Sequence, residues 1–352
     1  MTDRPVLVTG GAGFIGSNLA DRLAADGRNV FVYDSLVRPG VEANLAWLVE
    51  RWGRRITFIR ADVREVDTLV RAVREAHAVF HFAAQVAVTT SMQRPLEDFA
   101  VNLEGTLCVL EAIRLRRDPV PLLFASTNKV YGDLADVELE QQDDGYMPLD
   151  FSYRRSGVSE ARPLDFHTPY GCSKGAADQY VLDYCRSFGV PTCVMRMSCI
   201  YGQRQMGTED QGWVAHFGLQ ALQGQPITIY GDGHQVRDIL EVHDACAAYL
   251  EAWRHIDRTA GRAFNLGGGS ENAVSLRRVI AHIEALVGHA VPLELSAWRP
   301  GDQRWYVSDP RRVRGELRLA PFRPWRDGVA DLVHWLAEHR GIEMRAPERA
   351  AV

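Results

Sequence analysis

Tyr170 and Lys174 stand four residues apart in the run TPYGCSKGAAD, so in a helix both side chains project from one face. A free tyrosine has a pKa of about 10, which is too high for a base at neutral pH. A nearby ammonium favours the phenolate and lowers that pKa, and the pair therefore predicts a proton-transfer device. The alternative is a coincidental surface pair, which is common in helices.

Thr127 lies earlier in the chain, in the run FASTNKVYG, and offers a hydroxyl that could hydrogen-bond a reacting alcohol. In a strand, threonine is more often present only because it is β-branched. Thr127 is therefore a candidate catalytic residue only because Tyr170 and Lys174 occur in the same chain.

A glycine-rich run, residues 10–16 (GGAGFIG), joins an expected strand to an expected helix. Glycines there allow a tight turn and a close approach to a pyrophosphate, and the helix N-terminus offers free N–H groups. Asp34 ends the next expected strand, where a carboxylate hydrogen-bonds ribose hydroxyls and repels a 2′-phosphate. Together these features predict NAD, not NADP, and with the Tyr/Lys pair they predict hydride transfer at an alcohol carbon. The glycines alone would indicate only a tight turn.

Asp62 ends the third expected strand and has two interpretations of equal weight. Its carboxylate could cap the adenine amino group of the cofactor. It could instead be the N-cap of a helix over residues 64–76.

Alternating apolar and helical segments must position these residues. We expect strands at 5–10, 29–34, 56–62, 78–84, 121–126, 192–198 and 226–230, and helices at 16–26, 66–76, 99–116, 170–187, 211–223 and 272–287. Such alternation predicts an α/β fold with a parallel sheet and right-handed crossovers. Residues 132–168 look acidic and irregular. This insertion is either a substrate-covering loop, which we favour, or a plain surface insertion.

The composition excludes several classes of protein. The chain has 352 residues, 46% hydrophobic and 24% charged, as in an ordinary globular protein large enough for two parts. A net charge of −5 gives no sign of a nucleic-acid surface. No membrane-spanning run or signal peptide is recognisable, and the six cysteines lack CxxC spacing. We therefore expect a cytoplasmic protein with reduced cysteines, no metal site and no membrane partner.

Six motifs resemble the extended short-chain dehydrogenase/reductase family of nucleotide-sugar epimerases and dehydratases, over about residues 5–330. They are the glycine run, Asp34, HFAAQ (81–85), Asn102, STNKVYG (126–132) and YGCSK (170–174). The resemblance implies a Rossmann doubly wound parallel sheet that holds NAD, with a smaller C-terminal lobe for a nucleoside-diphosphate sugar. It also implies a homodimer formed by paired helices, here 99–116 and 170–187.

The resemblance further implies particular contacts. Those to the cofactor come from Gly10, Gly13, Phe14, Ile15, Gly16, Asp34, Asp62, Val63, Ala83, Ala84, Gln85, Asn102, Tyr170 and Lys174. Those to the substrate come from Gln85, Asn128, Lys129, Cys199, Gln205, Arg237 and Arg299. The two arginines match positions that clamp the diphosphate, a task suited to bidentate guanidinium groups. The alternative interpretation is that both are solvated surface arginines.

Departures from the family pattern narrow the expected activity. Dehydratases of this family carry an Asp-Glu pair after the active-site threonine, whereas this chain has Asn128 and Lys129, so dehydration is disfavoured. Cys199 replaces the asparagine of most 4-epimerases, and Glu241 replaces a usual tyrosine. Runs such as PITIYGDGHQVRD and RPGDQRWYVSD resemble the CDP-paratose (CDP-tyvelose) 2-epimerases.

These observations predict an NAD-dependent epimerase that inverts a ring carbon of a nucleotide sugar, most specifically C2 of a CDP-deoxyhexose. Thr127, Tyr170 and Lys174 are the expected catalytic residues. Alternatives are a 4-epimerase or dehydrogenase on the same fold, or a non-catalytic NAD-sensing regulator. We expect the NAD domain at 1–200 with a returning segment at about 235–265, the sugar-binding lobe at 201–234 and 266–340, and a loose tail at 341–352.

Overall fold

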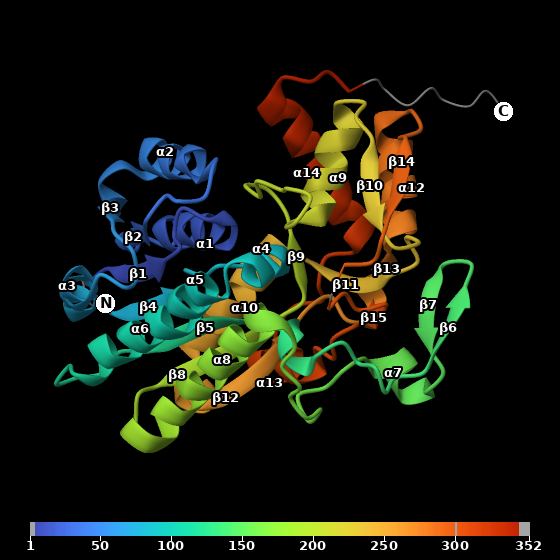
Figure 1. The fold of residues 1–352 in the computed structure, drawn as a ribbon. Helices are drawn as coiled ribbons and strands as arrows, with labels where there is room; N and C mark the ends of the chain where they lie inside the picture. Colours follow the sequence, from blue (N-terminus) through green and yellow to red (C-terminus); the bar gives the residue numbers. More distant parts are fainter. Residues whose placement is uncertain (1–3, 300, 345–352) are drawn as a thin grey trace.

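A large parallel sheet organises the N-terminal part of the chain in the computed structural model, which describes residues 4–299 and 301–344 (Figure 1). Its strands are β1 (Val6–Thr9), β2 (Val30–Asp34), β3 (Ile56–Arg60), β4 (Ala78–His81), β5 (Leu122–Thr127), β8 (Thr192–Met197) and β12 (Arg262–Leu266). They run parallel in the order β12-β8-β5-β4-β1-β2-β3, so the order reverses between β1 and β4. This confirms the predicted doubly wound α/β fold.

Helices cover both faces of this sheet. One face packs on α1 (Phe14–Ala25), α2 (Val41–Trp52), α10 (Val242–Arg254) and α13 (Arg311–Leu317), and the other on α3 (Val66–Glu75), α6 (Gly105–Arg114) and α8 (Thr168–Phe188). Successive strand residues serve opposite faces, since Val6 and Val8 contact the first set of helices and Leu7 the second. Strands buried on both faces explain the continuous apolar runs of the sequence.

A smaller lobe follows the sheet and appears beside it in Figure 1. It contains β9 (Cys199–Tyr201), β11 (Val236–Glu241), β13 (Ala273–Ser275) and β15 (Trp305–Tyr306) in one sheet, and β10 (Ile227–Tyr230) with β14 (Leu293–Ser296) in another. Its helices are α9 (Trp213–Leu222), α12 (Leu276–Val287) and α14 (Trp325–Arg340), whereas the short α11 (Ile256–Thr259) packs near β8 of the large sheet. A separate apolar cluster fills the space between α9, α12 and α14.

The segment expected to return to the NAD domain, at about 235–265, is divided between the large sheet and the smaller one. The returning segment supplies α10 and β12 to the large sheet and its covering helices, but its first strand, β11, lies in the smaller sheet. The domain division remains a prediction. Of the expected tail, residues 345–352 lie outside the described part of the chain.

The insertion at 132–168 is more regular than expected. It forms a hairpin of β6 (Leu139–Gln142) and β7 (Gly145–Pro148) and a short helix, α7 (Phe151–Ser156). The hairpin is held on the smaller lobe, because the Tyr146 amide donates to the His234 carbonyl at 2.9 Å and the Tyr146 hydroxyl to Asp232 at 2.5 Å. These tertiary contacts stabilise strands too short to be recognised from the sequence.

Two expected helices have different bounds. Residues 99–116 divide into the end of α5 (Pro95–Phe99), a π-helical turn η2 (Ala100–Glu104) and α6. The helix expected from residue 272 begins only at Leu276, because the turn η4 (Ser270–Asn272) and β13 precede it and Ser275 caps it. Among the described residues, no helix is both long and apolar enough to cross a membrane.

Candidate active site

The glycine turn lies at the edge of the sheet where the strand order reverses. Gly10 has φ +66°, and a Cβ there would come within 2.7 Å of the Ala83 nitrogen, beyond the end of β4. A Cβ on Gly16 would overlap the carbonyl oxygen of Gly10. The backbone of β1, β4 and α1 therefore converges at a place where only glycine fits.

This turn fits the pyrophosphate of a dinucleotide. Gly13 is the N-cap of α1 and has no side chain that could accept hydrogen bonds from the first N–H groups of the helix. These are the N–H groups of Phe14, Ile15 and Gly16. Free N–H groups and the positive end of the helix dipole favour an anion at this point. Phe14 and Ile15 also pack against the sheet, so they anchor the start of the helix.

Asp34 ends β2 beside the glycine turn. Its carboxylate accepts hydrogen bonds from the backbone N–H groups of Ala12 at 3.0 Å and Leu36 at 2.9 Å. Burial raises the pKa of Asp34, and these two hydrogen bonds oppose the rise. The carboxylate is thus fixed in orientation next to the cradle, where ribose hydroxyls of a dinucleotide would reach it.

The neighbouring predicted cofactor residues have different surroundings. The Asp62 carboxylate bonds the Arg64 backbone and guanidinium at 2.7–2.9 Å, while α3 is preceded by Glu65, so the N-cap interpretation of Asp62 is wrong. Val63 is buried against α6, in contact with the position of Gly105. Ala83 and Ala84 follow β4 in the same loop, partly exposed.

Gln85 and Asn102 are joined to each other. The Asn102 carboxamide accepts from the Gln85 backbone N–H at 2.9 Å and donates to the Gln85 carbonyl at 3.0 Å. The Gln85 side chain turns to Asp98 and Ala87. Asn102 is fully buried, and its contacts make it a brace for the loop after β4.

Thr127, Tyr170 and Lys174 come together from β5 and α8. Thr127 ends β5 and is 7% exposed, while Tyr170 lies in the first turn of α8, where its backbone N–H donates to Ser91 at 3.2 Å. The Thr127 hydroxyl donates to the Asn128 side-chain oxygen at 3.4 Å, and it lies near enough to the Tyr170 phenol to lower the pKa of that group. Lys174 stands one turn further along α8, with its Nζ 4.2 Å from the centre of the Phe124 ring. The expected constellation is therefore present in three dimensions.

The sequence predicts that Lys174 lowers the pKa of Tyr170, whereas in the structure the pKa of Tyr170 is raised. Burial raises the pKa of Tyr170 to about 12, although the nearby Thr127 hydroxyl opposes the rise. Burial also lowers the pKa of Lys174 to about 7, against the attraction of Asp178 and Asp98. Desolvation disfavours the charged form of each group, and it outweighs the attraction of the two carboxylates for Lys174. A positively charged nicotinamide beside the phenol would act in the opposite direction.

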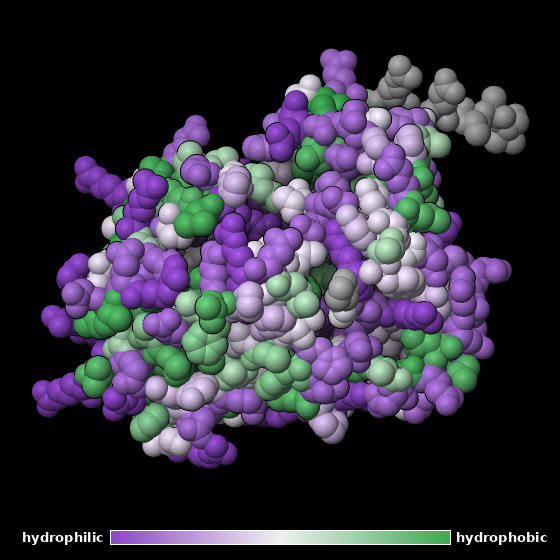
Figure 2. All heavy atoms as spheres, viewed as in Figure 1, coloured by the Kyte–Doolittle hydropathy of each residue, from purple (hydrophilic) through white to green (hydrophobic). Residues whose placement is uncertain are grey.

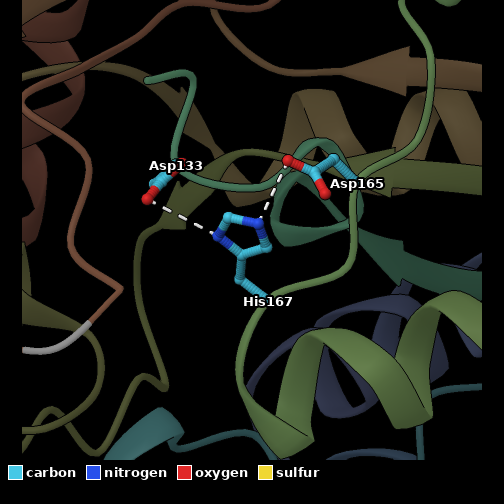
Figure 3. Close-up of side chains that lie close together, drawn as sticks. All are labelled: Asp133, Asp165 and His167. Atoms are coloured by element: carbon cyan, nitrogen blue, oxygen red, sulfur yellow. Dashed lines mark ion pairs between the residues drawn. The ribbon is translucent and has the colours of Figure 1, made fainter. Parts of the chain in front are cut away.

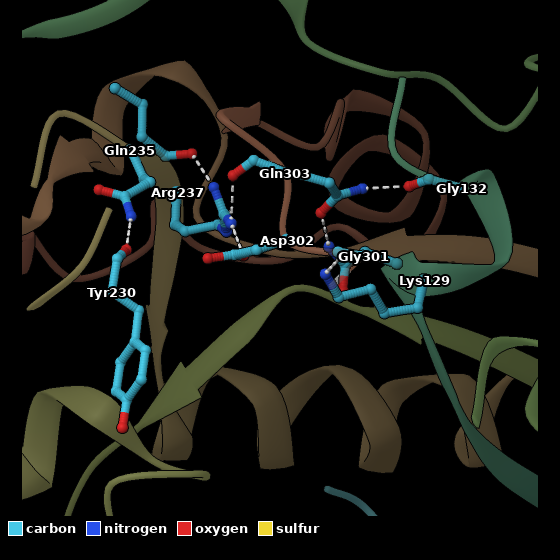
Figure 4. A network of polar contacts seen from close by, with 10 residues as sticks. Lys129, Gly132, Tyr230, Gln235, Arg237, Gly301, Asp302 and Gln303 are labelled. Atoms are coloured by element: carbon cyan, nitrogen blue, oxygen red, sulfur yellow. Dashed lines mark hydrogen bonds and ion pairs between the residues drawn. The ribbon is translucent and has the colours of Figure 1, made fainter. Parts of the chain in front are cut away.

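Asn128 and Lys129 connect the end of β5 to residues 301–303 (Figure 4). The Asn128 amide donates to the Gln303 side-chain oxygen at 3.2 Å, and Gln303 in turn donates to the Gly132 carbonyl at 2.6 Å. The Lys129 ammonium donates to the Gly301 carbonyl at 3.0 Å. Gln303 is fully buried and was not expected as a site residue, although the run RPGDQ contains it.

The two predicted arginines are already held by the protein. Arg237 donates to the Asp302 carboxylate at 2.6 Å and to the Gln303 carbonyl at 2.5 Å (Figure 4). Arg299 pairs with Asp210 at 3.2 Å, and its guanidinium lies 3.6 Å from the centre of the Tyr230 ring. These contacts fix both positive charges on the smaller lobe, where Arg237 lies in β11 and Arg299 follows β14.

Two other predicted substrate residues lie at the start of the smaller lobe. Cys199 begins β9, and burial raises the pKa of its thiol while the positive Arg237 opposes the rise. Gln205 donates to the Ile200 carbonyl at 3.2 Å, and its side-chain oxygen is buried with no hydrogen-bond partner in the described structure. Glu241, the other departure from the family pattern, caps α10 through the His243 backbone at 2.7 Å.

Asp133, Asp165 and His167 form the one group of described residues with side-chain atoms close enough to hold a metal ion, within 4.8 Å of one another (Figure 3). The two ring nitrogens of His167 face different carboxylates, Asp133 at 3.5 Å and Asp165 at 3.1 Å. The three side chains thus join the two ends of the insertion just before α8.

Comparison with known proteins agrees with this geometry. The sequence profile of the NAD dependent epimerase/dehydratase family matches residues 6–267. CDP-paratose 2-epimerase of Salmonella typhi is 39% identical over 337 residues, 94% of this chain and 98% of the relative. A dTDP-glucose 4,6-dehydratase of Actinoplanes is 32% identical over 346 residues, 95% and 98% of the two chains. The structure of UDP-glucose 4-epimerase from Thermus thermophilus with NAD has TM-score 0.80 and 31% identity, over 94% and 98% of the chains.

Proposed function

The chain belongs to the NAD-dependent epimerase/dehydratase family, and from this premise we propose that it epimerises a nucleotide sugar at one ring carbon, C2 of a CDP-deoxyhexose. The reaction oxidises a sugar hydroxyl to a ketone and reduces the ketone again from its other face. The similarity to CDP-paratose 2-epimerase, over nearly the whole of both chains, supports the choice of sugar and carbon.

One observation carries the choice of epimerisation over dehydration. Asn128 and Lys129, directly after Thr127, are engaged with Gln303 and Gly301. Neither an amide nor an ammonium can act as the carboxyl pair that removes water in the dehydratases. An oxidised sugar in this site has no carboxylate beside Thr127 to take a proton from the neighbouring carbon.

NAD is the cofactor of this family, and when bound it accepts a hydride from the sugar carbon and returns it. The glycine turn, the first N–H groups of α1 and Asp34 would hold its pyrophosphate and adenosine ribose. Ala83 and Ala84 follow β4, and Asp62 and Val63 follow β3, at the same edge of the sheet. Lys174 would bind the nicotinamide ribose.

Tyr170 removes the hydroxyl proton of the sugar and gives it back when the ketone is reduced. Thr127 donates a hydrogen bond to the oxygen as negative charge develops on it, an electrostatic role worth about two to three orders of magnitude in rate. Lys174 lies one turn after Tyr170 on α8, and in its protonated form it would favour the phenolate. Burial of all three excludes water from the proton transfer.

The smaller lobe would hold the nucleoside diphosphate. Arg237 and Arg299 are the proposed phosphate ligands, since bidentate guanidinium groups suit phosphate oxygens. Lys129 uses one of its three N–H donors on Gly301 and keeps two for the ligand. Cys199 and Gln205, with its buried free oxygen, lie at the neighbouring start of the lobe.

The test is incubation of the purified protein with CDP-, UDP- and dTDP-hexoses, followed by NMR of the products and absorbance of NADH. Inversion at C2 of a CDP-sugar with no accumulation of NADH is the expected result. Inversion at C4 would instead support the second candidate, a 4-epimerase, to which the similarity with the Thermus enzyme points. No turnover of any sugar, with NAD bound, would support a non-catalytic NAD sensor.

We also propose a homodimer through the helices expected from the sequence. Large apolar side chains are exposed along α4 (Val88–Gln93), α5, the end of α6 and α8, namely Met92, Leu96, Phe99, Leu115, Tyr180 and Phe188. Figure 2 shows apolar groups on the face of the molecule that carries these helices. Leu96 is 83% exposed, and exposed apolar side chains on neighbouring helices favour contact with another protein surface. Light scattering with size-exclusion chromatography tests this.

The six free cysteines agree with a cytoplasmic location, which fractionation of the source cells would test.

A further inference from the structure

A buried ion pair lies behind the catalytic residues and has no part in the reaction as written. Arg196 of β8 donates from Nε and Nη2 to the two oxygens of Asp178 on α8, both at 2.9 Å. The side chains are 5% and 0% exposed. Removing two charges from water costs free energy that such a pair rarely regains, so stability alone explains it poorly.

The same carboxylate joins the two elements that carry the catalytic residues. Ser126 donates to Asp178 Oδ2 at 2.7 Å, and Ser126 immediately precedes Thr127 on β5. Asp178 lies four residues after Lys174, one turn along α8. The bond therefore fixes how far the end of β5 slides along α8, and with it the separation of Thr127 from Tyr170.

Arg196 extends this connection across the sheet. Its Nη1 donates to the Tyr131 hydroxyl at 3.1 Å, and Tyr131 donates to the Asn265 side-chain oxygen of β12 at 2.7 Å. Tyr131 belongs to η3 (Asn128–Tyr131), which contains Asn128 and Lys129. A network of fully satisfied buried polar groups holds its members in one arrangement.

The charges around Lys174 come from four elements. Asp178 is on its own helix, Asp98 is on α5, and the Tyr170 phenol is one turn before it. His81 of β4 is buried and neutral, because burial lowers its pKa to about 3. The only other described cation in contact with these groups is Arg196, which neutralises much of the Asp178 charge.

The second carboxylate, Asp98, is held differently. It accepts from Ser173 at 2.5 Å, Gln85 at 2.9 Å and Asn102 at 3.1 Å, all of them neutral donors. Both carboxylates oppose the effect of burial on the pKa of Lys174, and Asp178 has the larger effect of the two. Asp178 is therefore the group whose removal changes both the charge on Lys174 and the placement of Thr127.

We propose that Asp178 is a positioning residue, whose carboxylate fixes Ser126, and thereby Thr127, against α8 and keeps Lys174 charged beside Tyr170. The rate effects below rest on the proposed epimerisation, whereas the ionisation of Tyr170 can be measured without any sugar.

Three variants separate the two parts of this role. Asp178→Asn keeps the shape and a hydrogen bond to Ser126 but removes the charge, whereas Ser126→Ala removes the bond and keeps the ion pair. Asp183→Asn is the matched control, since Asp183 is an exposed carboxylate on the same helix, paired with Arg186. Asp178→Asn should lower kcat at least about tenfold with KM within about threefold of wild type, a loss typical of slightly misplaced reacting groups.

The pH dependence distinguishes positioning from a merely structural role. Loss of the Asp178 charge makes Lys174 release its proton at lower pH, so the alkaline limb of kcat should move down by about half a unit or more. The Tyr170 phenolate, followed by ultraviolet difference absorbance against Tyr170→Phe in NAD-saturated protein, should form at higher pH. Ser126→Ala should lower kcat about three- to tenfold and leave both limbs in place, and Asp183→Asn should match wild type.

The proposal is overturned if folded Asp178→Asn keeps the wild-type kcat and the wild-type Tyr170 titration. Wild-type kcat in Ser126→Ala would overturn the geometric part. If the unpaired Arg196 prevents folding of Asp178→Asn, the neutral double variant Asp178→Asn/Arg196→Gln must give the same titration shift. If the wild-type chain turns over no nucleotide sugar, the proposed function fails, and the Tyr170 titration alone decides the role of Asp178.

Discussion

Asn128 at the end of β5 is hydrogen-bonded to Gln303, 175 residues away in the chain, at 3.2 Å. With the Lys129 contact to Gly301, this bond ties the strand that carries Thr127 to the segment before β15. The two positions at which a dehydratase would need carboxylates are thus used to hold the smaller lobe against the catalytic strand. This relationship determines what we expect of the reaction.

The product should have the same mass as the substrate, and no NADH should accumulate. An oxidised sugar without a carboxyl pair beside Thr127 has no route to losing water, so it is reduced again. Substrate deuterated at the inverted carbon should keep its label, and solvent deuterium should not enter, because a returning hydride requires no carbon deprotonation. Mass spectrometry and NMR measure all of these.

Each contrary result identifies a different reaction. Loss of water would indicate a dehydratase, and stoichiometric NADH would indicate a dehydrogenase. Entry of solvent deuterium at the inverted carbon would indicate that the carbon itself is deprotonated.

Tyr170→Phe should lower kcat by about two to four orders of magnitude, because the variant retains the ring and loses only the group that transfers the proton. Cofactor and sugar affinities should change little, as calorimetry can measure. Tyr180→Phe is the matched control, since Tyr180 lies on the same helix and is 45% exposed. Activity of Tyr170→Phe within a few-fold of wild type would assign the base to another residue.

Local patterns were sufficient to predict the parts of the site that are close in sequence. The glycine turn lies between β1 and α1, and Tyr170 and Lys174 share the helix α8, because these features depend on neighbouring residues. Contacts between distant residues, such as Asn128 with Gln303, arise from packing and left no signal in either segment.

The shift at Tyr170 illustrates the same limit. The spacing to Lys174 indicated attraction between the two groups, but the degree of burial that raises the pKa of Tyr170 depends on the whole surrounding fold. The insertion was described as irregular for a related reason. Its hairpin is held by contacts to Asp232 and His234, which the sequence of the insertion does not contain.

Asp34→Ala should weaken NAD binding and reduce the preference for NAD over NADP. The variant removes the acceptor for the ribose hydroxyls and the charge that repels a 2′-phosphate. A loss of about 1.5–3 kcal/mol in NAD affinity is expected for hydrogen bonds to a charged group. Calorimetry with both cofactors measures it, and Asp26→Ala, a surface carboxylate at the end of α1, is the control. Tighter binding of NADP than NAD by the wild-type protein would contradict the role of Asp34.

Lys129 should make the affinity for a nucleoside diphosphate decrease as the pH rises through about 8. Burial and the nearby Arg237 together lower the pKa of Lys129 to about 8, against the attraction of Asp302. The side chain is therefore positively charged below that pH and neutral above it. An anion held by Lys129 loses one favourable charge interaction on deprotonation, which we expect to weaken binding about tenfold. Calorimetry with CDP between about pH 7 and about pH 9.5 measures this.

Two variants identify the titrating group. Lys129→Met should bind CDP more weakly at neutral pH and show little change across the same range, because the group that titrates is gone. Arg237→Met should bind weakly at every pH but keep the decrease near pH 8, or somewhat above it, since loss of the Arg237 charge removes one cause of the lowered pKa. A wild-type affinity equal at both ends of the range would show that Lys129 does not contact the diphosphate. So would a Lys129→Met variant with the wild-type pH dependence.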